Sequence, residues 1–328
     1  RRRKYDFYLV VFLTILTVGY FTYNHMSAES RGVENYSEAL EAYKASDYEK
    51  AYEEFAKVPS GSTLKPSALF RQARCATNMD KKELAIKKYN RIVHSSVKSS
   101  IAPISEYNMA NLMFEIQDKG AKKHFKKIIK KYPTSDYAVA SNYYLGLIEV
   151  SNPPKSERGL KKSKNRAFIY FKNYLEEAPD GRFALKTIDE IKKLGVQLTN
   201  YDNLLIAKSY YANGEYTKAK DYLNKTTLAE SWSDFAKNEY KLGNKEKANY
   251  YAELGLKKHA SNTPNADVYE VIDNYIASFP LRRDGIIKLN SLGLNSTGAD
   301  YAAYLNCNEV VASNLKEACY RTLYEKYP

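Results

Sequence analysis

The chain has 328 residues, of which 44% are hydrophobic and 27% are charged, and its formal net charge at pH 7 is +13. A chain of this length and composition can bury a core, which excludes a mainly disordered protein. The positive charge favours anionic partners such as phospholipid headgroups and cell-wall polymers. No nucleic acid partner is expected, because no nucleic-acid-binding motif is present and the basic residues are spread along the predicted helices.

The N-terminal segment predicts a single-pass membrane anchor. Four basic residues precede an apolar stretch without charge or proline, Phe7–Tyr23. Because a helix rises about 1.5 Å per residue, such a stretch approaches the thickness of a bilayer's hydrocarbon core. We therefore expect a cytoplasmic basic tail over residues 1–4, a transmembrane signal-anchor over 5–25, a linker over 26–33 and an exported remainder. A cleaved signal peptide is the alternative.

From residue 34 onward the apolar residues recur at helical spacing with a period near 34 residues. An alanine is followed four positions later by a large apolar residue, and a third residue follows three positions further on. The pattern occurs at Ala51, Phe55 and Val58; Ala85, Tyr89 and Ile92; Ala121, Phe125 and Ile128; Ala167, Phe171 and Tyr174; and more weakly Ala219, Leu223 and Thr226. A repeat of this length predicts stacked helical hairpins and therefore an all-α solenoid.

The clearest hairpin covers residues 120–150. Pro133 ends its first helix, because proline lacks the N–H donor and crowds the preceding turn. Ser135 and its neighbours Thr134 and Asp136 then offer side-chain oxygens to the free N–H groups of the second helix.

The paired large and small residues Leu145-Gly146 and Ile206-Ala207, followed by Trp232 and Phe235-Ala236, resemble the tetratricopeptide repeat family. The resemblance covers roughly residues 34–262. It implies a right-handed α-solenoid of helix hairpins, preceded here by one transmembrane helix. It also implies a concave surface that binds protein partners.

Several segments depart from this pattern. The insertion over residues 151–165 is basic and contains prolines, so it is predicted to be a solvent-exposed loop. An extra helix is expected over 182–194. Ala252 and Gly255 stand where large residues are usual, so the helix that carries them is expected to pack thinly. Residues 263–328 are interpreted as further degenerate repeats that continue beyond the chain end, with helices over 267–278 and 301–327.

Tyr132-Pro133 and the following run SDYAVASNYYLG are similar to repeat proteins of the bacterial cell envelope. These include periplasmic subunits of outer-membrane assembly machines and the superhelical, non-catalytic part of soluble lytic transglycosylases. The resemblance implies an inner-membrane protein with a cytoplasmic N-terminus and a periplasmic solenoid. Three functions stay open: a scaffold for protein–protein interactions, the N-terminal part of a transglycosylase acting on peptidoglycan, and an accessory factor of secretion or outer-membrane assembly.

The sequence carries no motif for catalysis, cofactor binding or metal binding. No enzymatic activity is expected of these residues, although a catalytic domain could follow the chain end. The cysteines are Cys75, Cys307 and Cys319. Cys307 and Cys319 could form a disulfide in an oxidising compartment, but two unpaired core residues are the favoured interpretation.

Two basic groups form the candidate binding site for an anionic membrane surface or peptidoglycan. Two interpretations stay open, an anionic-partner site and a solvated helix face, because like charges at helical spacing repel one another. The residues are Lys119, Lys122, Lys123, Lys126, Lys127, Lys130 and Lys131 in the first group, and Arg158, Lys161, Lys162, Lys164 and Arg166 in the second.

Overall fold

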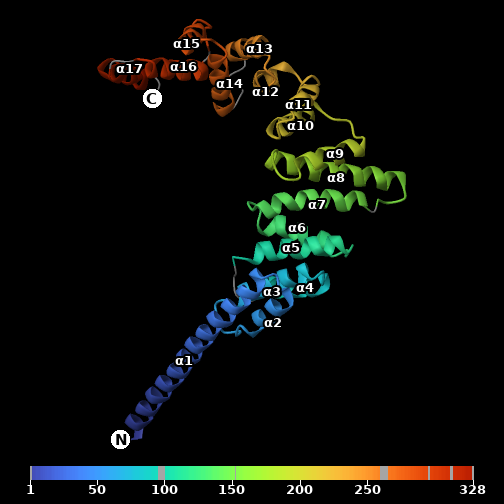
Figure 1. The fold of residues 1–328 in the computed structure, drawn as a ribbon, viewed down its shortest axis with the longest axis vertical. Helices are drawn as coiled ribbons and strands as arrows, with labels where there is room; N and C mark the ends of the chain where they lie inside the picture. The colour runs from blue at the N-terminus through green and yellow to red at the C-terminus, as the bar shows by residue number, and fades with distance from the viewer. Residues whose placement is uncertain are drawn as a thin grey trace. The chain divides into compact units, whose positions relative to one another are not determined.

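The computed structural model describes residues 2–94, 100–151, 153–258, 265–294, 296–310 and 313–326. All regular secondary structure in these ranges is helical, which confirms the all-α class (Figure 1). The chain forms two compact units, residues 1–151 and residues 152–328, and each is considered by itself.

The first unit is a stack of helices in which each element packs against its neighbours in sequence (Figure 1). This nearest-neighbour packing is typical of solenoids built from helical hairpins. Its helices are α1 (Arg2–Lys44), α2 (Tyr48–Lys57), α3 (Lys65–Asn78), α4 (Lys82–Val93), α5 (Ala102–Glu115), α6 (Ala121–Lys131) and α7 (Asp136–Ser151).

The second unit also consists of successive packed helices, and alternate helices contact one another as well. Thus α8 contacts α10, α10 contacts α12, and α12 contacts α14. The helices are α8 (Glu157–Glu177), α9 (Ala184–Leu194), α10 (Asn200–Ala212), α11 (Tyr216–Leu223), α12 (Leu228–Lys241), α13 (Lys245–Lys258), α14 (Asn265–Ala277), α15 (Arg282–Asn290), α16 (Ser296–Asn308) and α17 (Ser313–Lys326).

The repeated apolar residues form the core, as their spacing predicts. Every member of the four strong triads is buried, and Phe55, Phe125 and Phe171 have no exposed surface. In the weaker triad Ala219 and Leu223 are buried, whereas Thr226 is only half-buried. The predicted hairpin is also confirmed, because α6 ends before Pro133 and the Ser135 Oγ accepts a hydrogen bond from the Ala138 N–H at 3.2 Å.

Helix α1 is continuous from Arg2 to Lys44, so the expected linker over residues 26–33 is helical. Its second half packs on the first repeat, where the Glu29 carboxylate accepts a hydrogen bond from the Thr63 N–H at 2.8 Å. Its first half projects beyond the other helices of the unit (Figure 1), and residues 11–24 are all exposed. Arg1 and the side chains of residues 2–10 lie outside the described residues.

In the described part of the chain, none of the helices combines the length and the apolar character that a membrane crossing requires.

The insertion is partly misread by the sequence analysis. Helix α8 begins at Glu157, so the predicted loop is wrong for residues 157–165. The Ser156 Oγ accepts a hydrogen bond from the Gly159 N–H at 3.2 Å and so caps the new helix. This cap starts a helix directly after the two prolines, because such a bond satisfies one of the free N–H groups of the first turn.

The helix that carries Gly255 packs closely rather than thinly. A Cβ atom on Gly255 would lie 2.0 Å from the Trp232 ring, so the indole fills the space that a side chain would occupy. Trp232 is the largest fully buried side chain among the described residues. The small residue on α13 is therefore matched by a large residue on α12.

The C-terminal helices correct two further predictions. The helix expected over residues 301–327 is two helices, α16 and α17, and α15 was not predicted at all. The chain reverses between α16 and α17, and this brings the Cα atoms of Cys307 and Cys319 to 5.5 Å from each other. In one straight helix, twelve residues would separate them by about 18 Å.

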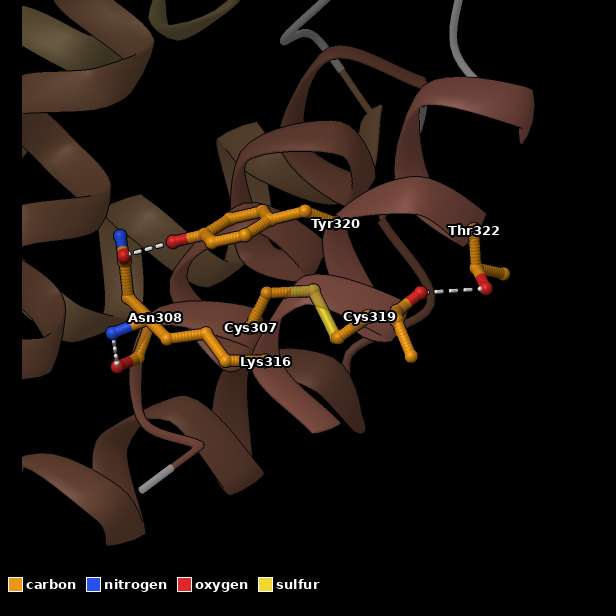
Figure 2. Close-up of a disulfide and its surroundings, with 7 residues drawn as sticks. Cys307, Asn308, Lys316, Cys319, Tyr320 and Thr322 are labelled. Carbon is orange, nitrogen blue, oxygen red and sulfur yellow. Dashed lines mark hydrogen bonds between the residues drawn. A yellow bond between two sulfur atoms is a disulfide. The ribbon is translucent and has the colours of Figure 1, made fainter. Parts of the chain in front are cut away.

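Cys307 and Cys319 form a disulfide (Figure 2), so the interpretation as two unpaired core cysteines is wrong. The Tyr320 hydroxyl and the Lys316 ammonium both reach Asn308, the last residue of α16 (Figure 2). These contacts and the disulfide hold α17 against α16. Cys75 is a free, buried cysteine, and burial raises the pKa of its thiol to about 11.

Candidate partner-binding surfaces

The predicted basic residues lie in both units. The lysines of residues 119–131 lie on or next to α6 in the first unit, and the basic residues of 158–166 lie on the first turns of α8 in the second. We therefore treat them as two surfaces.

Two of the lysines on α6 are bound to buried carboxylates of the flanking helices. The Lys127 Nζ lies 2.8 Å from the Glu106 Oε1 of α5, and the Lys122 Nζ lies 2.5 Å from the Glu149 Oε1 of α7. Glu106 has no exposed surface and Glu149 is 4% exposed. The sequence analysis considered only repulsion among the lysines of this segment, because these acids lie on other helices; the two ion pairs offset that repulsion for Lys122 and Lys127.

The Glu106 carboxylate also contacts a histidine of α6. The His124 Nδ1 lies 3.2 Å from the same Oε1 atom that Lys127 contacts. Burial raises the pKa of Glu106, but the hydrogen bonds from His124 and Lys127 outweigh it, and the pKa is lowered overall. Glu106 is therefore held as a charged group inside the first unit, where an unpaired charge would be strongly unfavourable.

The exposed basic surface of α6 is consequently narrower than the sequence predicts. Lys122 and Lys127 are only half-exposed and have structural partners. The remaining lysines are exposed, and we call them the α6 basic face: Lys119, Lys123, Lys126, Lys130 and Lys131.

On α8, two of the predicted residues line a groove within the second unit. Lys161 and Lys164 border it, together with Glu157 and the apolar side chains of Leu160, Phe168 and Ile169. Its opposite wall is the end of α9 and the turn that follows, residues 194–197. The groove has a volume of about 700 Å³. We call it the α8 groove.

Lys164 shapes the wall of this groove. Its Nζ donates a hydrogen bond of 2.9 Å to the Leu194 carbonyl at the end of α9, where Gly195 takes a positive φ of 63°. The ammonium thereby satisfies a carbonyl that the end of the helix leaves free. The other predicted residues on α8, Arg158, Lys162 and Arg166, are exposed on the same helix but do not line the groove.

The sequence analysis missed a row of lysine–carboxylate pairs in the second unit. Each pair joins one helix to the next alternate helix, so that α8, α10, α12 and α14 are linked in succession. The distances are 2.8 Å for Lys172 to Asp202, 3.7 Å for Lys208 to Asp234, and 2.6 Å for Lys237 to Asp267. The 30-residue separation of the first and third pairs is the signal that could have revealed the row.

Tyr211 and Glu270 extend this row at α14. The Tyr211 hydroxyl donates a hydrogen bond of 2.9 Å to Glu270, and the Lys237 ammonium lies 5.6 Å from the centroid of the Tyr211 ring. Lys237 is only 7% exposed. Burial lowers the pKa of Lys237, but Asp234, Asp267 and Glu270 outweigh it and raise the pKa overall. Each pair of the row therefore has one buried member, Asp202, Asp234 or Lys237, and one half-exposed member.

Across the described ranges, no three histidine, cysteine or acidic side chains are grouped so that they could hold a metal ion.

Comparison with known sequences agrees with the observed hairpins. The tetratricopeptide repeat matches residues 67–98, 105–135 and 203–227, which correspond to α3–α4, α5–α6 and α10–α11. No curated protein matches the chain.

Among solved structures, the C-terminal part of a tetratricopeptide-repeat-containing protein from Cytophaga hutchinsonii is similar at 16% identity. The match covers 86% of this chain and 98% of that one, with a TM-score of 0.33. At this score the likeness carries no weight for the fold. The matched segments and the helical hairpins that they form show that the chain contains tetratricopeptide repeats.

Proposed function

We propose that this protein is a membrane-anchored scaffold of the bacterial cell envelope that binds another protein through its repeats. Tetratricopeptide-like repeats generally bind protein partners, and stacked helices offer extended surfaces for this purpose. The proposal assigns no chemical reaction to these residues.

The observation that carries the membrane part of the proposal is the exposed apolar surface of α1. Phe12, Ile15, Leu16 and Val18 are between 52% and 64% exposed, although they belong to an uncharged stretch. Successive residues of a helix point in different directions, so uncharged and mostly apolar side chains lie on every side of this segment. Such a helix is normally buried in a protein core or in a membrane, and in this unit no core covers it.

The disulfide supports an extracytoplasmic location for the second unit. Disulfides persist in oxidising compartments such as the bacterial periplasm and are rare in the cytosol. The Cys307–Cys319 bond in the second unit fits export of the residues that follow the anchor. A basic N-terminal tail in the cytoplasm agrees with this orientation.

Extraction of membranes from cells that express the full chain tests the proposal. The wild-type chain should stay in the membrane pellet after washing with alkaline carbonate. Leu13→Arg together with Leu16→Arg should release it, because each arginine at the centre of a span disfavours insertion by about 2.5–3.5 kcal/mol. Val33→Arg is the matched control, because Val33 is 55% exposed on the same helix but lies beyond the apolar stretch. Release of the wild-type chain by carbonate would refute membrane anchoring.

A further inference from the structure

We propose that the α8 groove binds an acidic amphipathic helix of a partner protein. The proposal rests on the scaffold function above, and it names the surface and the chemistry of the partner. It is carried by apolar side chains of α8 that stay partly exposed where they line the groove, and by the excess of basic side chains on the same segment of α8.

Helix α8 has one apolar face that belongs to the core. Ala167 and Phe171 have no exposed surface, and Tyr174 is 3% exposed. These residues are the repeat triad and account for the packing of the helix. Leu160 lies seven residues before Ala167, on the same side of the helix but nearer its start, whereas Ile169 lies on the opposite side. They are 37% and 55% exposed, and with the half-buried Phe168 they line the groove. Apolar residues that face a hollow at this exposure point to a partner rather than to the stability of the unit.

The charges around the groove select the partner. Between residues 157 and 166, α8 carries five basic side chains and one acidic side chain, Glu157. Lys161 and Lys164 line the groove itself, and the Lys164 ammonium offsets the negative end of the α9 helix dipole by its hydrogen bond to the Leu194 carbonyl. A partner with carboxylates beside its apolar anchors would therefore meet complementary charge along α8.

The dimensions of the groove fit a short helix. Its lining on α8 runs from Glu157 to Ile169, which corresponds to about 18 Å of helix length. A volume of about 700 Å³ is enough to receive several apolar side chains. A partner helix laid against such a groove would contribute anchors at positions i, i+3, i+4 and i+7.

The test measures fluorescence anisotropy of a labelled 14-residue peptide with leucine at i, i+3, i+4 and i+7 and glutamate and alanine elsewhere, titrated with the full chain in detergent micelles. We expect saturable binding. Ile169→Ala and Lys161→Glu should each weaken it about fivefold or more, because one removes an apolar contact and the other reverses a groove charge. Lys247→Glu is the matched control, since it makes the same charge change at an exposed position of α13 and should leave binding unchanged.

Two further probes make the result decisive. A peptide with lysine in place of glutamate should not bind, and neither should one with glutamine in place of leucine. Equal losses of peptide affinity for Lys161→Glu and Lys247→Glu would indicate non-specific electrostatic attraction between the peptide and the basic chain, and would overturn the proposal. Failure of the wild-type chain to bind the acidic peptide would also overturn it, while membrane retention after carbonate would leave the anchoring proposal intact. If Lys161→Glu weakens binding to phosphatidylglycerol vesicles but not to the peptide, the surface binds lipid and the proposal is wrong.

Discussion

Gly255→Ala should destabilise the protein, although alanine is the better helix former. Gly255 lies within α13 with an ordinary helical backbone, so alanine would gain about 1 kcal/mol from intrinsic propensity in open space. The added Cβ would, however, lie 2.0 Å from the Cδ2 and Cε3 atoms of Trp232. Carbon atoms in contact are normally about 3.5–4.0 Å apart, so the indole would have to move by about 1.5 Å or more.

The indole has little freedom to make this movement. Trp232 is 1% exposed and belongs to a core that also includes Ala252, Leu256 and Ile272. Overpacking of a close-packed interior costs about 1–3 kcal/mol and occasionally more. After subtraction of the gain of about 1 kcal/mol in helix propensity, we expect a net loss of up to about 2 kcal/mol in the free energy of unfolding.

Trp232 is the chain's one tryptophan, so its fluorescence reports on this contact directly. Urea denaturation followed by tryptophan emission should show a lower midpoint for Gly255→Ala. Circular dichroism should show the same loss in the free energy of unfolding. It also allows Gly255→Ala to be measured in a Trp232→Leu background, where the smaller side chain should remove most of the cost of the added Cβ. A stabilising effect of Gly255→Ala in the wild-type background, or an equal effect in the Trp232→Leu background, would refute the reasoning.

Four further perturbations test other parts of the structure. Phe125→Ala should lower the free energy of unfolding by about 3–5 kcal/mol in urea denaturation, because the ring is fully buried, whereas the exposed Lys126→Ala should change it little. The pKa of Glu106 is lower in the folded chain than in the unfolded chain, so the ionised carboxylate stabilises the fold above about pH 4.3, and this stabilisation is lost as the pH falls through the folded pKa. The difference in the free energy of unfolding between wild type and Glu106→Gln should therefore shrink as the pH falls from about 4.3 through the folded pKa. Cys307→Ser should lower the free energy of unfolding of the second unit by about 2–4 kcal/mol, measured by thermal denaturation. A reducing agent should not lower the stability of this variant further. Binding of the chain to anionic vesicles should weaken as the salt concentration rises. Charge reversal of Lys123, Lys126 and Lys130 should abolish this binding without unfolding the chain. Unchanged binding would mean that the α6 basic face is an ordinary solvent-exposed helix face and not a binding site.

The repeat core could be predicted because apolar periodicity follows burial directly. An alanine at each triad's first position and an aromatic or aliphatic residue four positions later mark the face that meets the neighbouring helix, and the structure buries these residues in every strong triad. The Gly255 position shows the limit of this reasoning. Whether a small residue leaves a void or receives a large one depends on a side chain of another helix, and the spacing along α13 does not contain that information.

The insertion and the C-terminal region were misread for a local reason. Prolines and charges between residues 151 and 165 predict a loop, but a single capping hydroxyl, that of Ser156, is enough to begin α8 inside it. No glycine or proline lies between Asn308 and Ser313, so no helix-breaking residue indicates that α16 and α17 are separate helices. The sequence analysis allowed a Cys307–Cys319 disulfide but favoured two unpaired cysteines, because nothing in the sequence indicates that two packed helices bring the pair together.

The charged residues of the candidate surfaces were the hardest to interpret, because charge pairing in a solenoid connects different helices. Lysines on α6 looked unopposed in the sequence, yet Glu106 and Glu149 reach two of them from the helices on either side. The vesicle experiment must therefore spare Lys122 and Lys127, since reversing either would leave a buried carboxylate beside a like charge and confuse unfolding with lost binding.

The same reasoning explains why the row of lysine–carboxylate pairs in the second unit is better regarded as part of the fold than as a binding site. Asp202 and Lys237 are almost fully buried, and removal of one member of such a pair leaves the other charged and unsolvated. Each pair spans alternate helices, so it is formed only when successive hairpins stack in one register. Among the described residues, the exposed lysines of α6 and the Lys161 and Ile169 side chains of the α8 groove belong to no such buried pair. They are therefore the surfaces that can change charge or shape without loss of the solenoid, which is the property required of a site for a partner.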